Sequence, residues 1–242
     1  MSSLIDKERE FHNKRFAHGD DRDAQLKYYW AIAPQGDSFW ELIQDASRGA
    51  KVLEYGCSTG GRSAQLGLIA NRVEGIDISD VAIEHARKQC SAPNVAFHVM
   101  DAMNMTFADE TFDLVFGSGI IHHLDTARSM DEIWRVLKPG GQALFWEPLG
   151  LNPAINFYRR VTPGARTPDE HPLLPRDYQL MRNRFGKMDA EYFGLSTLAA
   201  VPFRHMSFAP IVRQILSRID SAILKIPTVN MLAWYSIIRL TK

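Results

Sequence analysis

The stretch that decides the fold is KVLEYGCSTGGR, residues 51–62. Residues 51–55 are apolar enough for a buried β-strand. They run into the glycine-rich turn 56–61, after which residues 63–71 predict a helix. Glycines let the backbone pass close to a ligand, and the first amides of a helix have no partner within it. A strand, a glycine turn and a helix N-terminus together indicate a nucleotide or nucleoside site.

Three classes of protein share such a turn. Gly56-x-Ser58-x-x-Gly61 matches a dinucleotide-binding fingerprint in which Ser58 replaces the middle glycine. Gly56-x-Ser58-x-Gly60 also matches the nucleophile elbow of a hydrolase. The third class is the S-adenosylmethionine (SAM) site of a methyltransferase, in which an acidic residue such as Glu54 precedes the glycines. A hydrolase needs several strands before its elbow, whereas about fifty mostly helical residues precede this one.

Composition restricts the function classes further. With 242 residues, 45% of them hydrophobic and 23% charged, the chain suits one α/β domain. A net charge of zero argues against a nucleic-acid partner held by bulk electrostatics. Residues 1–15 do not resemble a signal peptide, no apolar run reaches the ~18–20 residues of a spanning helix, and Cys57 and Cys90 indicate a reducing compartment. We therefore predict a cytoplasmic protein, whose oligomeric state the sequence leaves open.

The N-terminal residues 1–48 predict helices that are polar but carry several aromatic side chains. Gly19-Asp20-Asp21 and Pro34-Gln35-Gly36 are expected to break this segment into pieces. The segment either packs as a helical layer on a sheet edge or forms a lid over the ligand. In the second case Tyr28 and Tyr29 are the best-placed side chains.

From residue 51 onward strands and helices alternate. Strands are predicted over 51–55, 72–76, 95–100, 111–117 and 142–147, with Asp77 closing the second. Ser79 is expected to cap the helix after the second strand, and Asp125 or Thr126 the helix that ends at Pro139-Gly140-Gly141. This alternation predicts a parallel, doubly wound sheet that binds ligands at the carboxyl ends of its strands.

After Glu147 the pattern loosens. The proline-rich residues 148–175 predict a functional cap, residues 195–203 a sixth strand and residues 233–240 a last strand. The helix between the last two strands carries an apolar stripe at helical spacing, formed by Phe208, Ile211, Val212, Ile215, Leu216 and Ile219. We expect the stripe to pack on the core, and the alternative is contact with a membrane interface.

Over residues 50–148 the chain resembles the class I SAM-dependent methyltransferases that modify small molecules and lipids. The resemblance rests on Val52–Gly60 (VLEYGCSTG), GIDIS at 75–79, Asp101-Ala102, FDLV at 112–115, IHHL at 121–124 and LKPGG at 137–141. It implies a Rossmann-like sheet of seven strands with the last one antiparallel. The chain then divides into a lid (1–48), a SAM-binding core (49–148), a substrate cap (149–194) and a C-terminal part with the amphipathic helix (195–242).

The resemblance also implies which residues bind SAM. The methionine part would lie against the turn, formed by Glu54, Gly56, Cys57, Ser58 and Gly60. The ribose hydroxyls would bind Asp77, which stands 21 residues after Gly56. The remaining contacts would be Ile78 on the adenine face, Asp101 and Ala102 at its amino edge, Gly117 and Ser118 by the methionine carboxylate or amino group, and Tyr28 from the lid.

Methyl transfer is an in-line displacement that needs alignment, and a general base only when the acceptor must lose a proton. His123, after the fourth strand, and His171, in the cap, are the candidate bases, and His122 lies beside the first. Asp169, Glu170 and His171 are adjacent, and adjacent side chains seldom point at one ion, so no metal is predicted. Arg159, Arg160 and Arg166 fit an anionic acceptor or plain solvent exposure equally well.

We therefore predict a SAM-dependent methyltransferase acting on a small metabolite, lipid or glycan-type acceptor. One alternative is an NAD-type oxidoreductase, which Glu54 and the Pro-Gly-Gly before the fifth strand disfavour. The other is a protein that keeps the fold and binds a partner without catalysis. The sequence does not identify the acceptor atom.

Overall fold

The structure, a computed structural model, describes residues 9–10, 13, 23–162 and 170–242. Seven strands form one sheet in the order β3-β2-β1-β4-β5-β7-β6. Their bounds are β1 Lys51–Tyr55, β2 Arg72–Asp77, β3 Val95–Val99, β4 Phe112–Ser118, β5 Leu137–Pro148, β6 Lys187–Phe193 and β7 Tyr235–Thr241. Strand β7 runs antiparallel to both β5 and β6, whereas β1 to β5 pair in parallel. The predicted seven-stranded, doubly wound sheet is confirmed.

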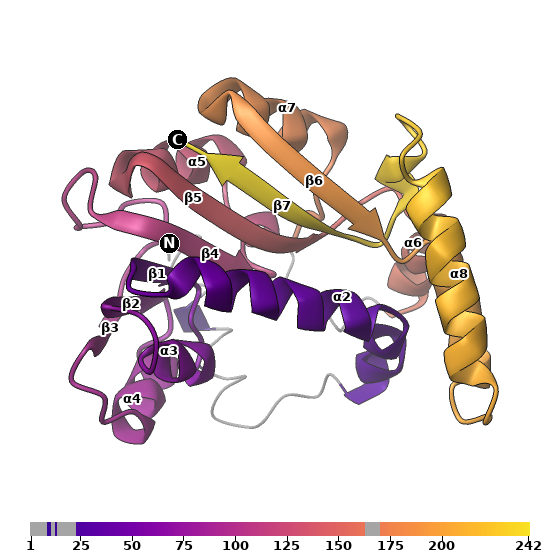
Figure 1. Cartoon of the computed structure of the whole chain (residues 1–242), viewed down its shortest axis with the longest axis horizontal. Helices are drawn as coiled ribbons and strands as arrows, with labels where there is room; N and C mark the ends of the chain where they lie inside the picture. The colour runs from indigo at the N-terminus through magenta and orange to yellow at the C-terminus, as the bar shows by residue number, and fades with distance from the viewer. Residues whose placement is uncertain (1–8, 11–12, 14–22, 163–169) are drawn as a thin grey trace.

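Helices cover both faces of this sheet (Figure 1). They are α2 Asp23–Ser47, α3 Gly61–Leu66, α4 Asp80–Gln89, α5 Thr126–Val136, α6 Pro153–Val161, α7 Pro175–Phe185 and α8 Ala209–Ile223, with short 3-10 helices at η1 Ile121–His123, η3 Ser196–Phe203 and η4 Asn230–Leu232. Alternate side chains of one strand enter different cores. Leu53 of β1 packs in the cluster that includes α5 and α7, and Val52 packs in the cluster that includes α2.

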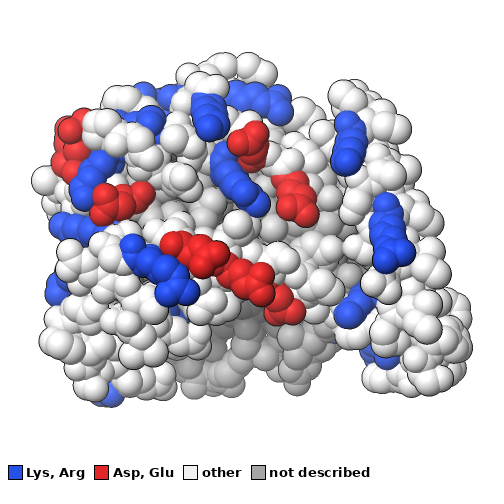
Figure 2. Space-filling model, in the orientation of Figure 1, with Lys and Arg blue, Asp and Glu red and all other residues white. Residues whose placement is uncertain are grey.

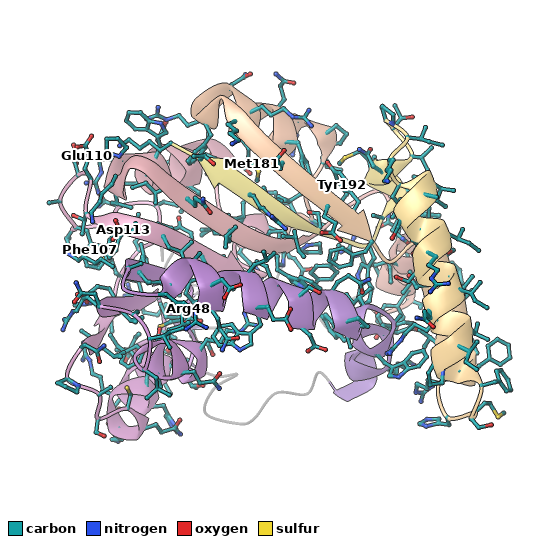
Figure 3. All side chains as sticks on the ribbon, in the orientation of Figure 1. Arg48, Phe107, Glu110, Asp113, Met181 and Tyr192 are labelled. Carbon is teal, nitrogen blue, oxygen red and sulfur yellow. The ribbon has the colours of Figure 1, made fainter. Side chains whose placement is uncertain are left out.

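The amino edge of the sheet is closed by local contacts. Asp113, at the start of β4, accepts hydrogen bonds from the Lys51 amide (2.8 Å) and from the Lys138 ammonium (2.7 Å). Phe107 packs edge-on against Phe112, with 5.0 Å between the ring centroids. Figure 3 shows Phe107, Glu110 and Asp113 gathered at this edge. The carboxyl edge, where the glycine turn lies, is therefore the edge open to a ligand.

Several predicted boundaries are wrong. Helix α2 continues through Pro34-Gln35-Gly36. A helix that packs along its length can contain a proline, because its tertiary contacts outweigh the lost backbone hydrogen bond. The helix predicted over 63–71 begins at Gly61 and ends at Leu66. Helix α5 ends at Val136, so that Pro139-Gly140-Gly141 lies within β5. Gly19-Asp20-Asp21 falls outside the described residues.

The sixth strand is also misplaced in the prediction. Residues 196–203 form η3, and the edge strand β6 is Lys187–Phe193. The cause is a distant carboxylate, Asp220 of α8, which is 2% exposed. It accepts hydrogen bonds from the amides of Leu195, Ser196 and Thr197 (2.7–3.2 Å) and from the hydroxyls of the last two. These bonds stabilise a helical first turn where a strand was expected.

The apolar stripe of α8 lies largely in solvent, which contradicts the predicted core packing. Phe208, Ile211, Ile215 and Ile219 are exposed, whereas Val212 and Leu216 are half-buried. Asp220 fixes the other side of α8 against η3, and this orientation turns the four side chains outward. Within the part of the chain that is described, no helix is long and apolar enough to cross a bilayer.

Candidate SAM site

The glycine turn joins the ends of β1 and β2. The amides of Gly56 and Cys57 both donate to the carbonyl of Ile76, at 3.0 and 2.8 Å. Gly56 (φ +81°), Ser58 (φ +51°) and Gly60 (φ +75°) have left-handed backbone conformations. Such angles favour glycine, and Ser58 adopts one of them although it carries a side chain. Burial raises the pKa of the Cys57 thiol well above its usual range, so this thiol packs as an apolar group.

Glu54 holds the other end of the turn. Its side chain is buried beneath α3, where one carboxylate oxygen accepts from the Ser63 amide (3.0 Å) and the Ser63 hydroxyl (2.5 Å). It thereby satisfies an N–H of the first turn of α3. Burial raises the pKa of Glu54 from 4.5 to about 7, against the opposing effect of the Ser63 hydroxyl.

This pKa makes SAM affinity sensitive to pH. SAM is a sulfonium cation, and only the deprotonated Glu54 attracts it, so the Kd for SAM is expected to fall about three- to tenfold from about pH 6 to about pH 8. The unfolding free energy should move the other way: the folded state holds the Glu54 proton between pH 4.5 and about 7, and its stability falls as pH rises through that window. Calorimetric titration of the parent and Glu54→Gln checks this. An equally steep pH dependence in Glu54→Gln would exclude Glu54 as its cause.

Asp77 closes β2 and contacts both flanking turns. One carboxylate oxygen accepts from the Ser58 amide (2.9 Å) and the other from the Ser79 amide (2.9 Å). Ser79 in turn caps α4, where its hydroxyl accepts from the Ala82 amide (3.1 Å), as the sequence predicts. Each carboxylate oxygen has a second lone pair, so Asp77 retains acceptor capacity for ribose hydroxyls.

Replacing Asp77 by alanine is expected to weaken SAM binding by ~1.5–3 kcal/mol, the range for hydrogen bonds to a charged acceptor. The variant also leaves the Ser58 and Ser79 amides without their partner, so a small loss of stability accompanies the change. Asp77→Asn is the matched control, because it keeps the size and one acceptor oxygen. Calorimetry measures the affinity, and denaturation separates it from folding. If Asp77→Ala binds SAM like the parent, Asp77 is not part of the site.

The N-terminal segment reaches this edge through residues that the sequence did not indicate. The Arg9 guanidinium donates to the Ile78 carbonyl (3.3 Å), and Asn13 bonds with Ser79 and Asp80 (2.6 Å each). These contacts lie next to Asp77 and Ile78, the residues predicted to bind the adenosine part of SAM. Tyr28 lies in α2, away from these contacts: its ring packs on Tyr158 of α6 and on Trp234, with centroids 5.0 and 6.3 Å apart. Tyr29 shares a hydroxyl contact with Tyr235 (3.1 Å).

The other predicted cofactor residues lie at the ends of β3 and β4. Asp101 accepts from the Met103 amide (2.8 Å), and the Ala102 carbonyl accepts from the Tyr55 hydroxyl (2.7 Å). These bonds tie the loop after β3 to β1. Gly117 and Ser118 are the last two residues of β4, next to β1 in the sheet.

Three histidines from two parts of the chain, positions 122–123 and 171, come together beyond β4. The rings of His122 and His123 stack, with centroids 4.2 Å apart, and the His171 amide donates to the His122 carbonyl (2.8 Å). The cap segment is held there by the Leu173 amide, which donates to Pro148 O at 2.9 Å. The structure thus brings both predicted bases, His123 and His171, to one place.

A buried carboxylate that the prediction missed organises this cluster. Glu147, in β5, is fully buried. One of its oxygens accepts from the Ile120 and Ile121 amides (2.9 Å each), and the other pairs with Nδ1 of His122 (2.8 Å). If Glu147 accepts this hydrogen bond, the His122 tautomer is the one that carries its proton on Nδ1. The available signal was a third acidic residue at a strand end, after Glu54 and Asp77.

The residues at this edge fit SAM. Two carboxylates, Glu54 and Asp77, flank a turn with left-handed backbone. Their negative charge suits a sulfonium cation, and their oxygens can accept hydrogen bonds from ribose hydroxyls. In the described part of the chain no three His, Cys, Asp or Glu side chains are close enough to hold a metal ion. Asp169 and Arg166 lie outside that part. Arg159 bonds to the Leu149 carbonyl (3.3 Å) and Asn156 (3.1 Å), and Arg160 is exposed.

Comparison with known proteins identifies the same segment. A family model described as a methyltransferase domain matches residues 53–145. A demethylmenaquinone methyltransferase of Chlorobaculum parvum is 35% identical over 143 residues, which cover 52% of this chain and 58% of that protein. A sterol 24-C-methyltransferase of Aspergillus fumigatus is 32% identical over 137 residues, covering 54% and 34%. The chain thus spans less than two thirds of the length of either relative.

A solved structure extends the likeness in fold to nearly the whole chain. The N-methyltransferase NodS of Bradyrhizobium japonicum, in complex with S-adenosylhomocysteine, superposes with a TM-score of 0.61 over 97% of both chains, at 15% identity. At that identity the match supports the fold alone. The family model runs from β1 to β5, the strands that carry Glu54 and Asp77, so residues 53–145 of this chain match the methyltransferase domain of the class I SAM-dependent type.

Proposed function

We propose that the protein is an enzyme that transfers the methyl group of SAM to an apolar small molecule. The observation that carries this proposal is the pair of strand-end carboxylates, Glu54 and Asp77, which hold the glycine turn from two sides. Bound SAM supplies an electrophilic methyl group. The protein aligns the acceptor with it and excludes water. The proposed SAM contacts also include Gly56, Cys57, Ser58, Gly60, Ile78, Asp101, Ala102, Gly117 and Ser118. Tyr28 is not among them, because its ring packs on Tyr158 and Trp234.

An apolar acceptor is supported by the cap. Helix α6 begins the predicted cap. Two large apolar side chains one turn apart on it, Phe157 and Val161, are 68% and 61% exposed and so are available to an apolar ligand. Two relatives are named for apolar acceptors, a demethylmenaquinone and a sterol. We infer a lipid-like acceptor; the name of the sterol relative gives carbon as the reacting atom in that chemistry.

For an acceptor that must lose a proton, we propose that His122 accepts it. Glu147 holds the Nδ1 proton of His122 and leaves Nε2 as the basic atom, an arrangement in which a carboxylate orients an imidazole. His123 and His171, the bases predicted from the sequence, are then residues that line the acceptor site. This role is supported by the ring contact of His123 with His122 and by the hydrogen bond from the His171 amide to the His122 carbonyl.

Calorimetry with SAM, S-adenosylhomocysteine and NAD tests the cofactor. We expect the first two to bind and NAD to give no heat, and the reverse result would favour the oxidoreductase alternative. Transfer of a labelled methyl group to an isoprenoid quinol, to a sterol and to a water-soluble amine then tests the acceptor class. Tight SAM binding with labelling of the amine alone would contradict the apolar acceptor.

A further inference from the structure

Helix α8 presents an ordered apolar face to solvent. Phe208, Ile211, Ile215 and Ile219 are 47%, 61%, 53% and 43% exposed. At about 100° per residue they fall within an arc of about 80°, so they form one straight stripe. Phe203 and Met206, in the turn before α8, are 45% and 54% exposed and extend the stripe. A contiguous apolar surface of this kind marks an interaction site more often than an accident of packing.

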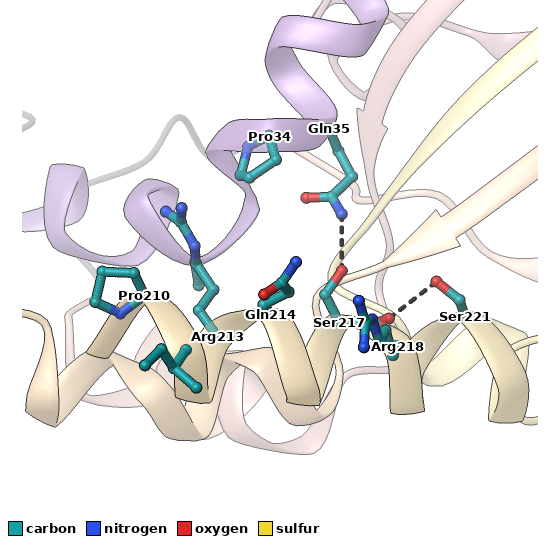
Figure 4. A pocket seen from close by; sticks show the side chains of 10 residues that line it. Pro34, Gln35, Pro210, Arg213, Gln214, Ser217, Arg218 and Ser221 are labelled. Atoms are coloured by element: carbon teal, nitrogen blue, oxygen red, sulfur yellow. Dashed lines mark hydrogen bonds between the residues drawn. The ribbon is translucent and has the colours of Figure 1, made fainter. Parts of the chain in front are cut away.

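The orientation of α8 is fixed by polar contacts on its other faces. Asp220 is bonded to the start of η3, and the Arg213 guanidinium donates to the Trp30 carbonyl (2.9 Å) and lies over the Trp30 ring. Gln35 of α2 donates to the Ser217 hydroxyl (3.2 Å), across a groove of about 430 Å³ between the two helices (Figure 4). The stripe therefore has a defined direction, away from the sheet.

The charges around the stripe have one sign. Between residues 195 and 232 the basic side chains are Arg204, Arg213, Arg218 and Lys225, and the one acidic residue is the buried Asp220. Figure 2 shows Lys and Arg, and no Asp or Glu, over α8. Within the described chain, Arg218 and Lys225 form no ion pair. The whole chain is neutral, but this surface is locally basic.

We propose that this face docks α8 on a membrane surface that contains anionic lipids. The four apolar side chains would enter the headgroup boundary, while Arg218 and Lys225 reach the phosphates. A second copy of the chain fits less well, because a stable interface buries roughly 800 Å² per partner and a twofold contact here would bring like charges together. Docking requires no SAM and goes beyond the proposed methyl transfer, although it would bring the site to acceptors dissolved in a bilayer.

Co-sedimentation of the full chain with vesicles, in the absence of SAM, tests the proposal. We expect binding to phosphatidylcholine vesicles containing phosphatidylglycerol, and weaker binding to phosphatidylcholine alone. Ile215→Asp should weaken binding at least about tenfold, because it puts a charge where the proposed contact would bury an aliphatic side chain in the bilayer. Arg218→Gln should reduce binding only to the anionic vesicles. Leu68→Asp is the matched control, since Leu68 is 86% exposed but follows α3, away from α8 (Figure 1).

Folding of each variant is checked by circular dichroism, and Phe208→Ser serves as a second variant if Ile215→Asp is unfolded. The proposal is overturned if the parent stays in the supernatant with both vesicles, or if folded Ile215→Asp and Phe208→Ser sediment like the parent. Light scattering supplies a further test. A parent dimer that Ile215→Asp converts to monomer would make this face a contact between copies and overturn the membrane assignment.

Discussion

His122→Ala is expected to lower turnover by about 10²- to 10⁴-fold while leaving the affinity for SAM nearly unchanged, for an acceptor that must lose a proton. The reason is the pair with Glu147, which in the proposed arrangement orients the His122 ring and leaves Nε2 to accept the proton. Single-turnover rates with a proton-bearing acceptor measure the effect, and calorimetry measures SAM binding. Denaturation confirms that the variant is folded.

Glu147→Gln tests the same pair from the other side. The amide keeps the size of the side chain. It has one acceptor oxygen, however, whereas the two backbone amides and the His122 ring bond to two oxygens of Glu147 in the parent. The orientation of His122 should weaken, so turnover falls in this variant too, with a loss of stability from the buried site. The double variant should be little slower than the slower single one, because the two residues act as a unit.

His171→Ala and His123→Ala separate this proposal from the sequence-based one. If both residues line the acceptor site, their replacement should raise KM for the acceptor more than it lowers kcat. A loss of 10²- to 10⁴-fold in kcat for His171→Ala, with His122→Ala close to the parent, would instead make His171 the base. A loss of SAM affinity in His171→Ala would point to a structural role for the cap.

The central fold was predictable because its signals are local. Strand β1, its glycine turn and the Asp77 that ends β2 lie within residues 51–77, and each is recognised from residues a few positions away in the sequence. The helix caps at Ser79 and Asp125 follow the same logic, since each side chain accepts from an amide three residues later. Alternation of such units restricts the topology to a doubly wound sheet.

The errors arise where a contact with a residue distant in sequence determines the local structure. Residues 195–203 form an apolar run, and periodicity cannot tell a buried strand from a buried helical turn. Asp220, more than twenty residues further along, settles the choice by accepting the amides of the first turn. The same carboxylate sets the orientation of α8, so one unpredicted contact explains both the misplaced strand and the exposed stripe. Glu147 was missed for a similar reason, because its three donors lie about 25 residues earlier.

Gly60→Ala is expected to lower the free energy of unfolding by ~2–5 kcal/mol, the sum of a left-handed backbone and an overpacked core. Gly60 has φ +75°, and an added Cβ would lie 2.5 Å from Cε1 of Phe97 and 2.8 Å from Cβ of Ala86. Both neighbours are buried in a small cluster with Cys57 and Ile83, so neither can move aside. Denaturant unfolding measures the change. SAM affinity should fall with it, since the same turn would carry the ligand.

Gly140→Ala isolates the backbone part of this effect. Gly140 has nearly the same φ, +78°, but no atom lies within 4 Å of an added Cβ, so its replacement should cost only ~1–2 kcal/mol. The packing part is tested by Phe97→Leu, which removes the two ring atoms that the new methyl group meets. In the Gly60→Ala background Phe97→Leu should cost less than it does alone, because the shorter side chain relieves the overlap. Additive losses, or equal losses for Gly60→Ala and Gly140→Ala, would mean that the packing of the turn on Phe97 does not require glycine at position 60.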